Sequence, residues 1–401
     1  MEKYNYIKDL LGKHVVSSGI SSCYVYIEEL MQENLLALRK ALPKGFDVFY
    51  ALKANPDREV VKKFYDFGCG MDVSSSGELK IALDSGVNIR DISFAGPGKT
   101  DEDIAYGVKS GIYVFSIENL DEIEKIEIAA YENGIIQKVS IRINPDKKFA
   151  GYGMVMGGVP SQFGLDIRQS YSAIKKITSS KSLELIGFHM HVGSQILSAN
   201  IFGDAVGYVI EYALYVKDKY KIDIQCLNFG GGLGICYHED QKPLDLNILR
   251  DVLREKVDNA FARKHLKNTR FIIEPGRFLI GSAGVYISKI LYIKSSFEKN
   301  YIIIEGGMHH NMAASGNLGQ VIRKNYHIDI LRTRKKAGTN ILKKYDIVGS
   351  LCTPLDRMAA DLMLSDVHTG DYVCFFNSGA YGYTASPLYF LSHPLPEIKV
   401  I

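Results

Sequence analysis

Eight short apolar segments recur along the first two-thirds of the chain, with polar, Glu- and Lys-rich stretches of helical length between them. Their length and their content of β-branched and aromatic residues are typical of buried strands. Strands that alternate with helices in this way pair in parallel and close into a TIM-like (β/α)8 barrel. The predicted strands are VFYAL (48–52), MDVSS (71–75), ISFAG (92–96), YVFSI (113–117), VSIRIN (139–144), LIGFHMHV (185–192), CLNFGGG (226–232) and FIIEPGR (271–277).

The pattern changes after Arg277, where strand-like segments follow one another with turns and little helix between them. This succession of strand-like segments predicts a mostly β C-terminal domain. An N-terminal strand, SCYVYI (22–27), precedes an amphipathic helix from Glu28 to Ala41 and has no helix-linked partner before it, so we expect it to join that sheet. The predicted boundaries are 36–280 for the barrel, and 1–35 with 281–401 for a β-sandwich or β-barrel domain.

Length and composition agree with a two-domain globular protein. The 401 residues exceed one barrel of about 250 residues. A net charge of +3 is too small for this size to indicate nucleic-acid binding, and no apolar run reaches the length of a membrane span. The N-terminus has no signal-peptide core, and six cysteines without CxxC spacing indicate reduced thiols, so we expect a cytoplasmic location.

Most of the unusual polar residues directly follow a predicted strand, at the end where barrels of this type carry their active sites. Lys53 ends the first strand in VFYALKANP. A lysine there is either solvated or, if it lies in a pocket, able to form a Schiff base with a carbonyl compound.

The triple glycine Gly230, Gly231 and Gly232 follows the seventh strand, and Gly276 and Arg277 follow the eighth. A tight loop is one interpretation of such glycines. Their position favours the other, a phosphate site in which successive backbone N–H groups turn toward one anion.

Glu274 lies in the same EPGR turn. A salt bridge with Arg277 is one possibility, and a bond to a protonated ring nitrogen at the far end of the ligand is the other. A lysine, a phosphate site and this carboxylate together match the aldehyde, phosphate and pyridine nitrogen of pyridoxal 5′-phosphate.

His189 and His191 alternate on the sixth strand, so their side chains are expected on the same side. Such a pair either binds a metal, as in barrel hydrolases, or includes an imidazole that stacks on a cofactor ring. His309 and His310 are adjacent and would point apart in a strand, which is poor chelating geometry. We therefore expect no metal. Ser194 is placed to donate to the phosphate.

Two further motifs have structural interpretations. GPGKT (96–100) imitates a P-loop, but Ser93 stands where that motif needs a glycine, and Thr100 with Asp103 instead predicts a helix capping box. The basic cluster Arg332, Arg334, Lys335 and Lys336 is either a solvated loop or a surface for an acidic partner.

Taken together, the motifs YALKAN, MDVSSSGEL, FAGPGKT, HVGSQ, GGGLG, EPGR, LCTPLD and GAYGY resemble the fold-type III pyridoxal-phosphate decarboxylases, the diaminopimelate/ornithine decarboxylase family, over nearly the whole chain. The resemblance implies an alanine racemase-like barrel with a β domain, and a homodimer with shared active sites. It implies Lys53 as the Schiff-base lysine, His191 as the ring-stacking residue, Glu274 as the partner of the ring nitrogen, and Cys352 as the residue contributed across the dimer interface. The remaining implied cofactor contacts are Asp72, Ser194, Gly230, Gly231, Gly232, Gly276, Arg277 and Tyr381.

The resemblance also bears on the substrate. In diaminopimelate and ornithine members an acidic residue follows the cysteine and holds the distal amine; here Thr353 stands there, with Asp356 three residues further on. The implied substrate contacts are Arg277, Cys352, Thr353, Asp356 and Tyr381. Several strings, including EGGMHHN and LCTPLD, are most similar to specialised-metabolism members, namely the butirosin-type glutamyl-carrier-protein decarboxylase and, more distantly, a siderophore decarboxylase.

We therefore expect α-decarboxylation of an amino acid with an extended distal end, free or tethered to a carrier protein. Diaminopimelate, ornithine or lysine decarboxylation is the alternative within the family. A racemase is disfavoured because the related alanine racemase has an arginine in the place of Glu274. A metal-dependent barrel hydrolase and an inactive cofactor-binding protein are the remaining rivals.

Overall fold

The computed structural model describes residues 2–149, 154–155, 157–262, 265–318, 323–334 and 341–401. The chain forms two compact units. The barrel unit comprises Met31–Ile235 and Lys242–Leu279, and the β unit comprises Met1–Leu30, Cys236–Gln241 and Ile280–Ile401.

Eight parallel strands of the barrel unit form a closed ring, as predicted. Each strand pairs with the next along the chain, and the last, β12, pairs with the first, β2. The alternation of strand and helix in the sequence dictates this closure, because a helical crossover brings each strand back parallel to the one before it. The strands are β2 (Phe46–Ala51), β3 (Gly70–Val73), β4 (Ile92–Phe94), β5 (Val114–Ile117), β6 (Gln137–Asn144), β9 (Leu183–His189), β11 (Cys226–Asn228) and β12 (Arg270–Ile273).

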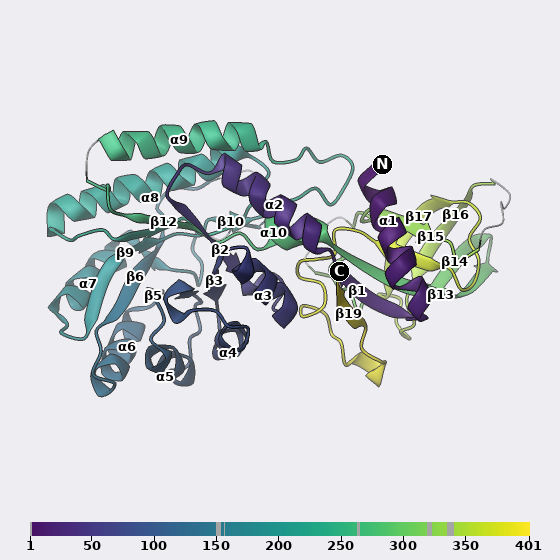
Figure 1. Cartoon of the computed structure of the whole chain (residues 1–401), viewed down its shortest axis with the longest axis horizontal. Coiled ribbons are helices and arrows are strands. Elements are labelled where there is room, and N and C mark those ends of the chain that lie inside the picture. The colour runs from purple at the N-terminus through teal and green to yellow at the C-terminus, as the bar shows by residue number, and fades with distance from the viewer. Residues whose placement is uncertain (1, 150–153, 156, 263–264, 319–322, 335–340) are drawn as a thin grey trace. The chain divides into compact units, whose positions relative to one another are not determined.

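Helices lie around this ring of strands (Figure 1). Several begin at a side chain that accepts a backbone N–H of the first turn, which satisfies a donor that the helix itself leaves unpaired. Thr100 and Asp103 form the predicted capping box at the start of α5. The helices are α2 (Glu28–Ala41), α3 (Arg58–Asp66), α4 (Ser76–Asp84), α5 (Asp101–Ser110), α6 (Leu120–Glu132), α7 (Ile167–Ser179), α8 (Ala199–Tyr220), α9 (Leu246–Ala262) and the short α10 (Arg277–Ile280).

Short elements complete the backbone description. They are the strands β7 (Met154–Val155), β8 (Leu165–Asp166) and β10 (Gly193–Ser194), and the 3-10 helices η1 (Val16–Ser18), η2 (Leu52–Ala54), η3 (Ile89–Asp91), η4 (Gly281–Ala283) and η5 (Phe390–Ser392).

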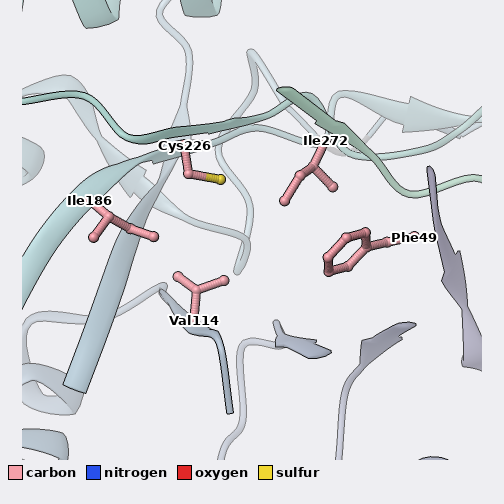
Figure 2. Packing of buried hydrophobic residues seen from close by; sticks show 5 residues of the cluster. All are labelled: Phe49, Val114, Ile186, Cys226 and Ile272. Atoms are coloured by element: carbon pink, nitrogen blue, oxygen red, sulfur yellow. The ribbon is translucent and has the colours of Figure 1, made fainter. Parts of the chain in front are cut away.

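Apolar side chains from five barrel strands point toward one another inside the ring (Figure 2). All are 3% exposed or less. This packing makes the barrel a solid core rather than a pore, so that chemistry is left to the strand ends. The cluster is Phe49, Val114, Ile186, Cys226 and Ile272.

The β unit is an eight-stranded sheet with one N-terminal helix, α1 (Glu2–His14). The N-terminal strand β1 pairs antiparallel with β13 and parallel with β19, so the prediction that it joins the C-terminal sheet is confirmed. The strands are β1 (Ser22–Tyr26), β13 (Gly284–Ser296), β14 (Lys299–Ile304), β15 (Ile328–Leu331), β16 (Lys343–Val348), β17 (Arg357–Leu364), β18 (Tyr372–Phe375) and β19 (Glu397–Val400).

Among the described residues, none of the helices combines the length and apolar character that crossing a membrane requires.

Candidate active site

A cavity of about 180 Å³ lies at the C-terminal ends of the barrel strands. It brings Lys53, His191 and Glu274 together, although more than 80 residues separate any two of them in the sequence. The lining residues are Lys53, Ser74, Ala95, Gly96, Pro97, Gly98, Arg142, Phe163, His189, His191 and Glu274.

Lys53 is paired with a buried carboxylate. Its Nζ lies 2.8 Å from Oδ2 of Asp72, which ends up beside it because Ala51 pairs with Asp72 in the barrel sheet. Asp72 is only 1% exposed, whereas the Lys53 side chain is 41% exposed and reaches the cavity. Burial and the nearby charge of Glu274 raise the pKa of Asp72 to about 7, although Lys53 opposes this.

Glu274 is held by a different set of groups. Asn228 Nδ2 and Ser93 Oγ donate to its Oε1, the latter at 3.2 Å, and His189 Nε2 lies 3.4 Å from its Oε2. Burial alone favours the neutral acid, but His189, Lys53 and Asn228 together outweigh it and hold the pKa of Glu274 below its usual value. The cavity therefore contains a permanent negative charge that suits a protonated ring nitrogen.

His191 is fixed by the glycine loop. Its Nδ1 accepts a hydrogen bond from the Gly231 N–H at 3.1 Å, so the proton of the neutral ring lies on Nε2. Burial, together with the charges of Arg142 and Lys53, lowers the pKa of His191 well below its ordinary value. A neutral imidazole in a set orientation is suited to lie against an aromatic ring.

His189 and His191 both line the cavity, but only His189 belongs to strand β9. The Nδ1 of His189 lies 2.7 Å from Ser116 Oγ. Among the described residues, no group of three or more His, Cys, Asp or Glu side chains has an arrangement that could hold a metal ion.

The triple glycine packs more tightly than expected. A Cβ at Gly231 would lie 2.0 Å from the Glu274 carbonyl oxygen, and one at Gly232 would lie 2.2 Å from that of Gly193. Contrary to the expectation of three converging donors, the Gly230 N–H bonds Asn228 Oδ1 and the Gly231 N–H bonds His191. The glycines are needed for close approach of backbones, and the loop orients Asn228 and His191.

An anion site next to this loop is compatible with the remaining residues. Arg277 opens helix α10, and its Nη2 lies 3.4 Å from Ser194 Oγ. Gly276 packs so closely that a Cβ there would lie 2.7 Å from the Cβ of Ala54. A guanidinium, a hydroxyl and a helix N-terminus are groups that bind phosphate.

The candidates of the β unit lie on two loops. Cys352 is exposed, and Thr353 accepts the Leu355 N–H through its hydroxyl at 3.3 Å. Asp356 is buried, and its two oxygens accept the N–H groups of Met308 at 2.6 Å and Leu351 at 2.9 Å. Asp356 therefore ties the cysteine loop to the Gly-Gly-Met turn instead of presenting a free carboxylate.

Tyr381, the last candidate of the β unit, has a φ of +55°, in the left-handed region that bulky residues rarely adopt. Backbone strain of this kind is concentrated at functional sites. The backbone next to Tyr381 is closely packed, since a Cβ at the neighbouring Gly382 would lie 2.7 Å from Tyr24 Oη.

Several lining residues were not identified from the sequence. Arg142 does have a sequence signal, because a charged residue inside a buried strand such as VSIRIN is unusual. Phe163 and Ser74 carried no signal of this kind. The GPGKT motif predicts a helix cap, and its Gly96, Pro97 and Gly98 also form part of the cavity wall, while Lys99 is buried against Glu122.

Two smaller candidates lie in the β unit. His309 and His310 were expected to point apart, but they lie in a turn after β14, with ring centroids 4.0 Å apart. In the basic cluster, Arg332 and Arg334 are both exposed, and Arg332 donates to the carbonyl oxygens of Ser365 and Asp366. Lys335 and Lys336 lie outside the described residues.

Comparison with known proteins identifies the family. The sequence profile of the family described as "Pyridoxal-dependent decarboxylase, pyridoxal binding domain" matches residues 28–281. The chain belongs to this family. The family resemblance stated from the motifs is thereby confirmed.

Relatives within the family cover nearly the whole chain. L-glutamyl-[BtrI acyl-carrier protein] decarboxylase of Niallia circulans is 36% identical over 93% of this chain and 87% of its own length. Diaminopimelate decarboxylase of Aquifex aeolicus is 31% identical over 98% of this chain and 90% of its own. The crystal structure of diaminopimelate decarboxylase from Methanocaldococcus jannaschii, 28% identical, superposes with a TM-score of 0.87 over 98% of this chain and 88% of that chain.

The protein is a pyridoxal phosphate-dependent decarboxylase, a carboxy-lyase that releases carbon dioxide from an amino acid or a derivative. The cavity fits this cofactor, because it combines an amine, a permanently negative carboxylate and a fixed imidazole in one enclosure.

Proposed function

We propose that the enzyme decarboxylates the α-carbon of an amino acid whose distal end is extended and carries no free amine, such as a glutamyl group tethered to a carrier protein. One observation supports this most directly. The loop after Cys352 offers no available carboxylate for a distal amine, since Thr353 is neutral and Asp356 is bonded to two backbone N–H groups. The 36% identical relative acts on a carrier-bound glutamyl group.

The residues of the barrel unit take the following roles in this proposal. Lys53 would hold the cofactor covalently through its amine, and the His191 imidazole would contact its ring. Ser194, Gly232, Gly276 and Arg277 bind the phosphate. The bound cofactor supplies an electron sink for the bond that breaks at the α-carbon.

Glu274 controls that sink. Because its carboxylate stays ionised, Glu274 would favour a protonated ring nitrogen in the bound cofactor, and this would favour loss of carbon dioxide over simple exchange of the α-proton. The Asp72 carboxylate accepts a hydrogen bond from the Lys53 ammonium and keeps this group beside the cavity.

We assign the final proton transfer to Cys352 of a second subunit in a homodimer with shared sites. The exposure of Cys352 and of Leu355 nearby, which is 53% exposed, supports a loop that another chain covers. Thr353 and Tyr381 would contact the substrate. The six cysteines are unpaired in the structure, and this supports a reducing compartment such as the cytoplasm.

The decisive experiment measures carbon dioxide by mass spectrometry after incubation with pyridoxal phosphate and a panel of substrates. The panel contains carrier-bound glutamate, citryl-diaminopropionate, and free glutamate, diaminopimelate, ornithine and lysine. We expect release from an extended substrate without a distal amine. Comparable release from diaminopimelate, which the 31% identical relative decarboxylates, would instead support the primary-metabolism alternative.

Two controls accompany this experiment. Borohydride trapping and peptide mapping should locate the pyridoxyl adduct at Lys53, and Lys53→Ala should give none. Charge reversal at the exposed Arg334 should reduce turnover of a carrier-bound substrate but not of a free one, whereas Arg332→Ala, which disturbs a loop contact, should affect both equally.

A further inference from the structure

Four charged side chains are buried together at the cavity wall that the ends of β4, β5 and β6 form. Arg142 Nη1 lies 2.7 Å from Glu118 Oε1, and Lys99 Nζ lies 3.1 Å from Glu122 Oε2. All four side chains are 8% exposed or less. Buried charges of this kind are retained only when each one is paired and hydrogen-bonded.

Glu118 joins three segments that are distant in the sequence. Its Oε1 accepts from Arg142 and from the Gly96 N–H at 2.7 Å, and its Oε2 accepts from the Gly164 N–H at 3.2 Å. These donors belong to strand β6, to the loop after β4 and to the segment before β8.

All three segments contribute to the wall of the cavity. Gly96 and Arg142 line it directly, and so does Phe163, which precedes Gly164. The Arg142 guanidinium lies over the Phe163 ring, 5.1 Å from its centroid. Glu118 itself does not line the cavity, so it acts on the site through the residues that it holds.

Glu122 belongs to the same network but has different contacts. It accepts the Glu118 N–H at 2.9 Å and pairs with Lys99, whose Nζ also donates to the Gly96 carbonyl oxygen at 2.7 Å. Neither Lys99 nor Glu118 is among the lining residues. Glu122 is therefore a natural control, a carboxyl group that is similarly buried but one step further from the cavity.

We infer that Glu118 is a positioning residue that holds the Arg142 guanidinium inside the cavity and sets the spacing of the Gly96 and Phe163 walls before any ligand binds. The inference rests on the proposed function only in taking this cavity as the cofactor site. Without Glu118, a buried guanidinium would lack its counter-charge and would turn toward solvent. The segments that carry Gly96 and Phe163, which Glu118 holds together, would then move apart.

The ionisation of Glu118 agrees with this role. Burial favours the neutral acid, but Arg142 and Lys99 outweigh it and lower the pKa of Glu118. The carboxylate therefore remains charged and able to accept three hydrogen bonds.

The test compares Glu118→Gln with Glu122→Gln in cofactor-free protein. The dissociation constant for pyridoxal phosphate is measured by absorbance titration, and thermal stability is measured in parallel. We expect both variants to lower the melting temperature. Only Glu118→Gln should weaken cofactor binding, by about tenfold, which is the equivalent of one lost charge-assisted hydrogen bond.

A double-mutant cycle makes the assignment specific. If Glu118 acts through Arg142, then Glu118→Gln combined with Arg142→Gln should bind the cofactor no more weakly than Arg142→Gln alone. Glu118→Asp, which keeps the charge but shortens the reach, should fold if the glutamine variant does not, and should show the same selective loss of binding.

Equal dissociation constants for the Glu118 and Glu122 variants would overturn the inference, and so would fully additive losses in the cycle. Failure of the wild-type chain to form an adduct at Lys53 would instead overturn the proposed site.

Discussion

Asp72 and Glu274 are both buried carboxyl groups of the barrel, but their pKa values move in opposite directions. Glu274 receives hydrogen bonds from Asn228 and Ser93 and lies beside His189. Asp72 has the Lys53 ammonium and a longer contact of 3.5 Å with Ser93. Two acids in one site can thus remain in different protonation states at the same pH, because their partners differ.

The first prediction concerns the charge of Glu274. Glu274→Gln removes the negative group that would hold a proton on the cofactor ring, and the rate of carbon dioxide release should fall by about 10²-fold or more. Ser93→Ala is the matched control, since it removes one 3.2 Å bond and leaves the carboxylate in place. Similar rates for the Glu274 variant and the wild type would contradict the assigned role.

The second prediction concerns the pH dependence of stability in cofactor-free protein. The folded-state pKa of Asp72 is raised to about 7, above that of an unfolded aspartate near 4. Its contribution to stability is therefore complete below about pH 4 and is lost as the pH rises through about 7, a change of a few kcal/mol. Asp72→Asn should flatten this decline in melting temperature.

The control for this pH experiment is Asp66→Asn. It removes an exposed pair with Lys62 and should leave the decline unchanged. If the melting temperature of Asp72→Asn still declines with pH as in the wild type, another group is responsible for the decline.

At the scale of elements, the glycine loop after β11 works by close backbone packing. The third prediction follows from it. Gly231→Ala would place a Cβ 2.0 Å from the Glu274 carbonyl oxygen, so it should lower the free energy of unfolding by about 1–3 kcal/mol and reduce cofactor retention. Gly98→Ala meets no protein atom within 4 Å and should leave the free energy of unfolding unchanged. Chemical denaturation and cofactor content after dialysis measure both effects.

The existence and order of the barrel strands could be predicted from the sequence, because each strand is a local run of apolar residues. Their ends could not. CLNFGGG was predicted as one strand, but β11 ends at Asn228, where the glycines begin their contacts with neighbouring loops. The periodicity of apolar residues indicates which positions are buried. It does not indicate where the backbone hydrogen bonds between two strands end.

At the scale of the whole molecule, the fourth prediction tests the shared site. Lys53→Ala and Cys352→Ala should each be inactive alone. Mixed and allowed to exchange subunits, they should recover about a quarter of wild-type activity, because half of the dimers are mixed and one of the two sites in each is intact. A mixture that stays inactive after exchange, shown by mass-tagged subunits, would place both residues in the same chain's site.

The sequence by itself determined the barrel, the added β domain, the family and the side chains with cofactor chemistry, because these depend on local patterns and on motifs that are continuous in the chain. Only the tertiary structure decided which side chains are free to contact a ligand and which are occupied by other protein groups. It placed Glu118 between Arg142, Gly96 and Gly164, and it committed Asp356 to Met308 and Leu351. Hydrogen bonds between segments far apart in the chain follow from the packing of the strand ends, and no local pattern encodes them.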